Sequence, residues 1–357
     1  MASILDLGSL TLNPQEALAA SEAIFELLFA KPELNDAHLV ATGIQMQTQI
    51  PIYGQFGLVG QQSAGTCTAN EESGQIKASE KYWIPKLIDM RFPHCQEQID
   101  QLFKMWKRSN SGLMTWEEIE SEQEAFVLSR VMDATLQSIL RISSFGDTDE
   151  DEVGSGGNLT VGTTLAYFTM LDGLWPQIIT AVTALTLTAR VNITNNAAPT
   201  YTAQDDLADD AALKIMRSMY EQIDVRARTE LDLKFQITDS LFRNWQTFLE
   251  NKSLAFTLQT TEERKSTDGW TYRGIPIVVR MDWDRIIRTY FDTGTAWYLP
   301  HRAILTPLNN IPIGTSNESD FQNFKMFYDE YRKYHYTDVA YYIDCKLLEE
   351  YAIAVAY

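Results

Sequence analysis

The residues best suited to chemistry are few and scattered along this 357-residue chain. Its histidines and cysteines are His38, His94, His301, His335, Cys67, Cys95 and Cys345. His94 and Cys95 are adjacent and could both bind a metal, but no further ligand follows at the spacing of a zinc site, so a structural role fits better. Three widely spaced cysteines argue against a disulfide framework and fit a reducing cytoplasm.

No catalytic motif stands out. The sequence contains no G-x-S-x-G, no P-loop, no G-x-G-x-x-G and no H-E-x-x-H. Acidic residues number 48 against 29 basic ones, so no particular carboxylate pair is marked as acid and base. The densest basic cluster, Lys104, Lys107 and Arg108, ends a predicted helix and suits its dipole better than a nucleic-acid surface. The sequence therefore predicts no enzyme and no cofactor, and leaves open only an unfamiliar active site.

Charge is distributed unevenly. The net charge is −19, and the run 147–152, DTDEDE, holds five acids in six positions. A solvated turn is the simpler interpretation of this run. The alternative is a weak divalent-cation site with Asp149, Glu150 and Asp151 as candidate ligands, although the glycine and glutamate of an EF-hand loop are missing.

The segment 44–94 is neutral within this acidic chain. It carries four acids and four bases, whereas residues 1–43 carry six acids and one base. Apolar residues alternate weakly over 44–60, the tip at 61–74 is almost purely polar, and the chain returns over 75–92. Such a hairpin-like excursion is marginal alone in water, so it needs outside support. It is either a long solvated loop or a contact element.

Helical periodicity is strongest over 116–142. Thr115 and Glu118 fit a capping box, and a helix of this length spans about 40 Å, which suits a scaffold spine better than a pocket wall. Further helices are expected over 13–31, 96–107, 163–182 with a bend at Gly173–Pro176, 205–223 and 240–250.

Strand patterns occupy much of the second half. We expect strands over 183–193, 231–237, 255–261, 339–347 and 351–357, with the apolar run 268–287 pairing with 255–261. Pro276 within that run cannot donate to a ladder, which places it at a sheet edge, a strand start or a bulge.

This order of helices and strands predicts an α+β protein of one large or two smaller domains. No apolar run is long enough to span a membrane, and the first residues do not form a secretory signal.

Several phrases of the second half together resemble one family. They are 172-DGLW-175, 211-AALKIMRSMYEQID-224, 235-FQIT-238, 272-YRGIPIV-278 and 300-PHRAILTPLNNIPIGT-315. In this order the chain resembles the major capsid proteins of tailed bacteriophages, with the shell fold named after the Hong Kong phage. More loosely, it is similar to those of phages of gut Bacteroidota.

The resemblance implies a division of the chain. Residues 1–43 would be an N-terminal arm, and 44–94 an extended loop lying over a neighbouring subunit. Residues 95–190 would form a peripheral domain with the spine helix 116–142, and 191–335 an axial domain. Residues 336–357 would supply C-terminal strands that return to the peripheral and axial sheet.

The resemblance also implies a function and partners. The chain would assemble as pentamers and hexamers into an icosahedral shell around double-stranded DNA. It would do so in the bacterial host cytoplasm and reside in the virion, with portal and separate scaffolding or decoration proteins and no membrane. Candidate subunit-contact residues are Tyr53, Phe56, Lys77, Lys81, Trp83, Trp270, Tyr272 and Arg273. Some family members cross-link a loop lysine to an asparagine, but nothing here marks the asparagine, so no cross-link is predicted.

Two other interpretations remain at this point. One is a nanocompartment shell of the same fold that encloses protein cargo, and the other is an enzyme with an unrecognised site. For a capsid subunit, deleting 62–74 should leave folded chains that fail to close shells. Divalent cations or salt should then offset the net negative charge, with 147–152 as the candidate site.

Overall fold

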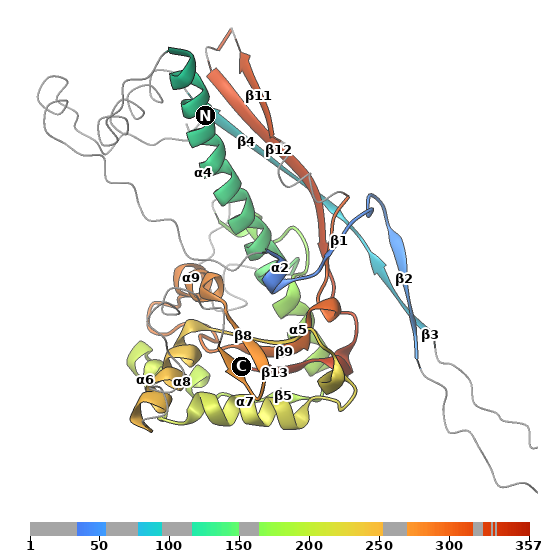
Figure 1. Cartoon of the computed structure of the whole chain (residues 1–357), viewed down its shortest axis with the longest axis vertical. Coiled ribbons are helices and arrows are strands. Elements are labelled where there is room, and N and C mark those ends of the chain that lie inside the picture. The colour runs from blue at the N-terminus through green and yellow to red at the C-terminus, as the bar shows by residue number, and fades with distance from the viewer. Residues whose placement is uncertain are drawn as a thin grey trace, which may run out of the picture.

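The computed structural model describes residues 34–54, 78–94, 116–149, 164–252, 270–316, 324–329, 331–332 and 334–357. Within these ranges it shows a body built on two sheets and a two-stranded ribbon that projects from it (Figure 1). The helices predicted over 13–31 and 96–107, the tip at 61–74 and the strand over 255–261 lie outside the described residues.

A long strand, β12 (Tyr334–Cys345), organises the first sheet. It pairs antiparallel with β4 (Lys86–His94) over nine residue pairs. Its two ends pair with β11 (Phe324–Asp329) and β10 (Ile313–Gly314), and β10 also carries β1 (Val40–Ala41). The helix α4 (Trp116–Phe145) lies alongside this sheet, as Figure 1 shows. The predicted spine helix is thus confirmed, and it continues three residues beyond 142.

The second sheet has six strands and both of its faces are buried. Its order is β5 (Arg190–Val191), β13 (Ala354–Ala356), β9 (Ala303–Pro307), β6 (Leu233–Ile237), β8 (Ile275–Val279) and β7 (Thr271–Tyr272). Side chains alternate between the faces, so Ala303 and Leu305 join one core while Ile304 joins the other. Because both cores are apolar, β9 is a continuous buried run.

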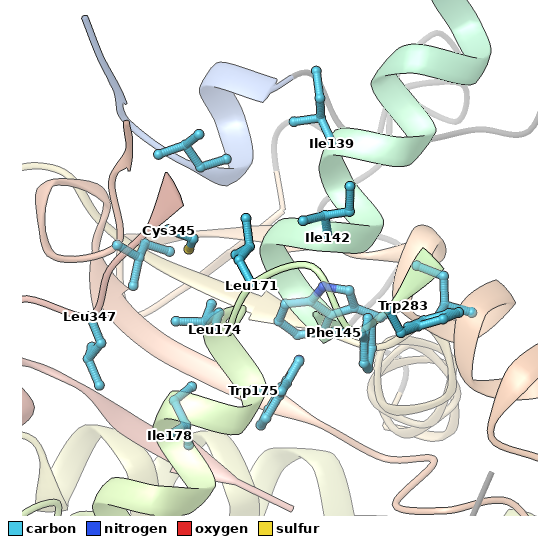
Figure 2. Close-up of a cluster of buried hydrophobic side chains, with 14 of the residues drawn as sticks. Ile139, Ile142, Phe145, Leu171, Leu174, Trp175, Ile178, Trp283, Cys345 and Leu347 are labelled. Carbon is cyan, nitrogen blue, oxygen red and sulfur yellow. The ribbon is translucent and has the colours of Figure 1, made fainter. Parts of the chain in front are cut away.

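Helices cover the two faces. On one face lie α7 (Ala211–Gln222) and α8 (Asp239–Asn251). On the other lie α5 (Leu174–Thr183), α9 (Met281–Tyr290) and the C-terminal end of α4. Figure 2 shows this second core, where Phe145, Trp175 and Trp283 from three helices gather. The centroids of the Trp175 and Trp283 rings are 5.2 Å apart, in an edge-to-face arrangement.

Short elements complete the body. They are α2 (Leu34–Ala37), α6 (Tyr201–Asp205) and the 3-10 helices Leu165–Tyr167, Thr194–Ala197, Ala227–Thr229, Leu308–Asn310 and Glu350–Ala352. The ribbon consists of β2 (Thr48–Tyr53) and β3 (Ala78–Trp83), paired antiparallel from Thr48↔Trp83 to Tyr53↔Ala78.

The prediction of a strand-like run over 268–287 was only partly correct. Its second half is the helix α9, because Trp283, Ile286 and Ile287 recur at helical spacing and bury one face. The first half forms the hairpin β7–β8, whose turn residues Arg273 and Gly274 both have positive φ, at 52° and 79°. Pro276 is the second residue of β8, before the ladder to β6 begins at Ile277, so its predicted place near a strand start is confirmed.

Four other boundaries were wrong. The helix predicted over 163–182 is a 3-10 turn followed by α5, because Gly173 approaches α4 so closely that a Cβ there would lie 2.6 Å from the carbonyl oxygen of Ile142. The helix over 205–223 begins only at Ala211, as α7, because residues 206–210 form a loop after the separate short helix α6. The strands over 183–193 and 351–357 shrink to β5 and β13. In each case a loop or 3-10 turn replaces part of the regular element.

Candidate subunit-contact surface

The ribbon β2–β3 leaves apolar side chains in water. Met46, just before β2, and Tyr53, at its end, are each 73% exposed. Tyr82 on β3, Ile84 between β3 and β4, and Leu87 on β4 are also exposed. In Figure 1 the ribbon forms a separate two-stranded layer beside the body. A two-stranded ribbon has no core of its own, so this much exposed apolar surface indicates an interaction site.

The ribbon is not packed onto its own body along its length. Between β2 and the body runs a groove of about 390 Å³, with Ile50 and Tyr53 on one wall and Arg226 and Tyr351 on the other. β2 pairs only with β3 among the described strands, so its other edge is free, and Pro51 lies in this edge strand.

Three contacts fix the base of the ribbon. The Nζ of Lys81 donates to Oε1 of Glu350 at 3.0 Å and to the carbonyl of Leu347 at 2.7 Å. The backbone N–H of Ile84 donates to Oδ2 of Asp344 at 2.7 Å, and burial raises the pKa of that carboxyl. Beyond Ile84 the chain enters β4 and is held by the ladder to β12. The part of 44–94 nearest residue 94 is therefore integrated into the body, and of the residues described in this segment those of β2–β3 project.

The predicted contact residues of this region have different environments. Tyr53 is exposed on the ribbon, and Lys81 is half-exposed in its ion pair. Trp83 is buried against its own chain, where the six-membered part of its ring covers Gly314. Phe56 and Lys77 lie outside the described residues.

The other predicted contact residues lie on the body. Trp270 packs against Phe242 and Trp245 at ring-centroid distances of 5.8 and 5.4 Å. Tyr272 packs against Phe235 at 5.9 Å. Both rings are thus largely used within the chain, while Arg273 is exposed at the hairpin turn. The structure therefore does not gather these residues and the ribbon into one patch.

The predicted cation ligands are only partly visible. Asp149 is exposed after α4, whereas Glu150 and Asp151 lie outside the described residues. Among the residues that the structure describes, no group of three histidines, cysteines or acids is placed to hold a metal. The cation site at 147–152 stays a prediction.

One contact of a catalytic type occurs inside the body. The hydroxyl of Ser240 lies 2.7 Å from Nδ1 of His301, and Nε2 of His301 lies 2.8 Å from the carbonyl oxygen of Gln204. Because a carbonyl only accepts, Nε2 carries the proton and Nδ1 accepts from Ser240. His301 has no exposed surface, and burial lowers its pKa. This dyad is a buried link between α6, α8 and β9, out of reach of a substrate.

A buried ionic network was invisible in the sequence. Arg280 donates to Asp282 at 2.7 Å, to Gln236 Oε1 at 2.6 Å and to Ser144 Oγ at 3.0 Å. It ties β6, α4 and α9 together at the centre of the body. Gln236 and Ser144 are 44 and 136 residues from Arg280, and no local signal relates them.

Comparison with known proteins identifies the fold. No protein-family model and no curated protein sequence matches the chain. Among solved structures, the capsid of the cyanophage P-SCSP1u matches with a TM-score of 0.53 at 14% identity, over 95% of this chain and 91% of that one. A structure from Mycobacterium phage Ogopogo matches with a TM-score of 0.51 at 12% identity, over 99% of both chains. One from Gordonia phage Cozz matches with a TM-score of 0.50 at 12% identity, over 95% and 90%.

These matches cover nearly the whole chain. In the part of the chain that the structure describes, no helix has the length and apolar content to cross a membrane. The chain has the α+β shell fold of the major capsid proteins of tailed phages.

Proposed function

We propose that this chain is the structural subunit of an icosahedral phage capsid and that copies of it cover each other's ribbons. The observation that supports this most directly is the ribbon β2–β3, which exposes Tyr53, has Met46 and Ile84 exposed beside it, and presents an edge that no described strand pairs with. Each contact of this kind can be weak, because a shell holds every subunit through many contacts at once.

Charge favours the ribbon as the contact element. The chain as a whole carries −19, which opposes close approach of two copies, but the predicted loop 44–94 has equal numbers of acids and bases. We propose the division into arm, extended loop, peripheral domain, axial domain and C-terminal strands with the boundaries given above.

We further propose how the shell is composed and what it encloses. The shell would consist of pentamers and hexamers, enclose double-stranded DNA without reading its sequence, and form in the host cytoplasm with portal and scaffolding or decoration proteins. The three solved structures named above come from a cyanophage, a Mycobacterium phage and a Gordonia phage, so the proposed link to phages of gut Bacteroidota rests on the sequence resemblance alone.

A pair of matched double variants tests the ribbon. Tyr53→Ser with Ile84→Ser removes two exposed apolar groups from the ribbon region, and Val225→Ser with Leu231→Ser removes two from the body, where Leu231 is fully exposed. Negative-stain microscopy of the purified proteins should show closed shells for the wild type and the body variant, and unassembled chains for the ribbon variant. The unassembled chains of all three should have the same melting temperature. Shells from the ribbon variant, or none from the wild type under any assembly condition, would argue against the proposal.

The contents of the particles test the finer claim. Particles recovered from infected cells should protect double-stranded DNA from nuclease. Small uniform particles that contain a protein cargo and no DNA would instead support a nanocompartment.

A further inference from the structure

One pocket in the body is lined by charges of both signs. It has a volume of about 510 Å³ and lies between the end of α4, α5 and the segment before β9. Its lining includes Arg302, the acids Asp147, Asp149 and Asp172, the Lys81–Glu350 ion pair, and the aromatic surfaces of Phe145 and Trp175. Figure 2 shows Phe145 and Trp175 at this junction of helices.

Arg302 is a buried cation without an anionic partner among the described residues. Its side chain is 2% exposed. Its Nε donates to the carbonyl of Leu299 at 2.8 Å and one Nη to the carbonyl of Tyr298 at 3.3 Å, and these are its only acceptors within the described ranges. The guanidinium also lies over the rings of Trp175 and Phe145, at 4.9 and 5.1 Å. Burial lowers the pKa of Arg302 to about 10, as expected for a charge that no carboxylate balances.

The three acids that line the same pocket take part in hydrogen bonds but form no ion pair with a described base. Asp172 Oδ1 accepts from the N–H and hydroxyl of Thr148, and Asp147 Oδ1 accepts from the N–H of Asp149. No lysine or arginine that the structure describes forms an ion pair with any of the three. Burial, followed by the nearby charges of Asp172 and Asp149, raises the pKa of Asp147. Arg302 is thus a buried charge without a counter-charge, whereas Asp149 and Asp172 are exposed and Asp147 is half-buried, so the acids supply unpaired negative charge where the pocket meets solvent.

We propose that this pocket binds a small zwitterion of the amino-acid class, with its carboxylate on Arg302 and its ammonium among Asp147, Asp149 and Asp172. The free Nη of Arg302 can donate to a carboxylate with charge-assisted hydrogen bonds. The aromatic walls cover the apolar part of the molecule, and the volume lies within the usual range for small-molecule sites. A phosphate or other polyanion is disfavoured because the acids would repel it.

Titration calorimetry of the purified full-length chain tests the site with matched probes. The probes are ω-amino carboxylates of four to eight carbons, each compared with the carboxylate and the amine of the same length. We expect one of the amino carboxylates to bind at least tenfold more tightly than its single-charge partners. Equal binding of all three compounds at every length, or no binding at millimolar concentration, would overturn the proposal.

Three variants test which residues bind the carboxylate and which bind the ammonium of the ligand. Arg302→Met should abolish binding of the amino carboxylate. Arg302→Lys keeps the positive charge but not the planar donor fork, and it should weaken binding at least tenfold. The lysine variant decides the question where the methionine variant fails to fold. Asp172→Asn should lower the affinity for the amino carboxylate towards that for the simple carboxylate. Unchanged affinity in folded Arg302→Lys and Asp172→Asn would place the ligand elsewhere. None of these outcomes depends on shell assembly, so they are separate from the test of the proposed function.

Discussion

The Nζ of Lys81, near the base of the projecting ribbon, lies 3.0 Å from Oε1 of Glu350, just before the last strand of the body. This ion pair, together with the bond from Lys81 to the carbonyl of Leu347, fixes β3 to a segment more than 260 residues away in the chain. The direction in which the ribbon leaves the body therefore depends on a contact that is half-exposed to solvent.

Lys81→Met should alter assembly more than stability. Exposed or half-exposed ion pairs are worth about 0–1 kcal/mol, so the free energy of unfolding in urea should fall by no more than ~1 kcal/mol. The yield of closed shells should drop, because the ribbon loses its fixed direction. Lys214→Met is the matched control, since Lys214 pairs with Asp210 on α7, away from the ribbon. Equal shell yields from both variants would contradict this role of Lys81.

Gly314→Ala should strain the junction between ribbon and body. A Cβ at this position would lie 2.8 Å from two ring atoms of Trp83 and 2.9 Å from Cδ1 of Ile44. Overpacking of this kind costs about 1–3 kcal/mol, measurable by chemical denaturation. Combining it with Trp83→Phe, which removes the ring atoms in the way, should cost less than the sum of the two single changes. Strict additivity would show that the ring moves aside freely.

Asp282→Leu should be among the most destabilising changes in the body. It leaves the fully buried guanidinium of Arg280 without its carboxylate, and breaking one side of a buried pair costs about 3–5 kcal/mol. The double variant Arg280→Met with Asp282→Leu should unfold at a higher denaturant concentration than Asp282→Leu alone, because no unpaired charge remains. A double variant less stable than Asp282→Leu would mean that the bonds of Arg280 to Gln236 and Ser144 matter more than the ion pair.

Local patterns predicted the helices better than their ends. The spine helix was recognisable because its apolar positions recur at helical spacing over many turns. Its last residues, Ser143 and Ser144, looked like the start of a loop. They remain helical because Ser143 bonds the carbonyl of Leu140 and Ser144 accepts from Arg280 and Trp283. The partners of Ser144 lie far along the chain, so no local window contains them.

The ribbon and the body differ in how far sequence reveals contacts. Neutral composition marked 44–94 as unusual, but the burial of Trp83 depends on Gly314, more than 200 residues later. Trp270 and Tyr272 were plausible surface aromatics by sequence, yet Phe242, Trp245 and Phe235 pack against them. The unpaired Arg302 gave no sequence signal either, since a lone arginine in an apolar strand region is identified only once its acceptors are known.

Acid should destabilise the chain partly through His38. Its Nδ1 bonds the carbonyl of Ile311 at 3.1 Å, and burial followed by the charge of Arg280 lowers its pKa from 6.5 to about 3. Above pH 6.5 both folded and unfolded chains hold it neutral. Below that value only the unfolded chain gains the proton, so stability falls as pH falls towards 3. Replacing His38 by Asn, whose amide can keep the bond to Ile311, should therefore remove ~2 kcal/mol of the loss between pH 7.5 and pH 5.

Denaturant unfolding of both proteins at these two pH values gives the difference directly. His301, whose pKa is also lowered by burial, is present in both proteins and cancels in the comparison. If the free energy of unfolding fell between these two pH values by the same amount in the wild type and in His38→Asn, the acid sensitivity would belong to His301 and other groups.

Asp284 should act in the opposite direction. Burial is the main cause that raises the pKa of this carboxyl to about 7, the charge of Asp239 adds to it, and the backbone N–H of Asp239 donates to Oδ2 at 2.7 Å. As pH rises from 3.8 to 7 the unfolded chain loses the proton and the folded chain keeps it, so stability falls as pH rises through this window.

Asp284→Asn keeps a neutral acceptor for the Asp239 N–H at every pH. At pH 8 it should therefore raise the free energy of unfolding by ~1–3 kcal/mol, and at pH 4 it should change little. Asp210→Asn is the matched control, because the hydrogen bond from Lys214 lowers the pKa of Asp210 and its loss should bring no gain at pH 8. If Asp284→Asn were no more stable than the wild type at pH 8, the charged carboxylate would be better compensated by Arg243 and Arg288 than its burial implies, and the predicted pH dependence would be lost.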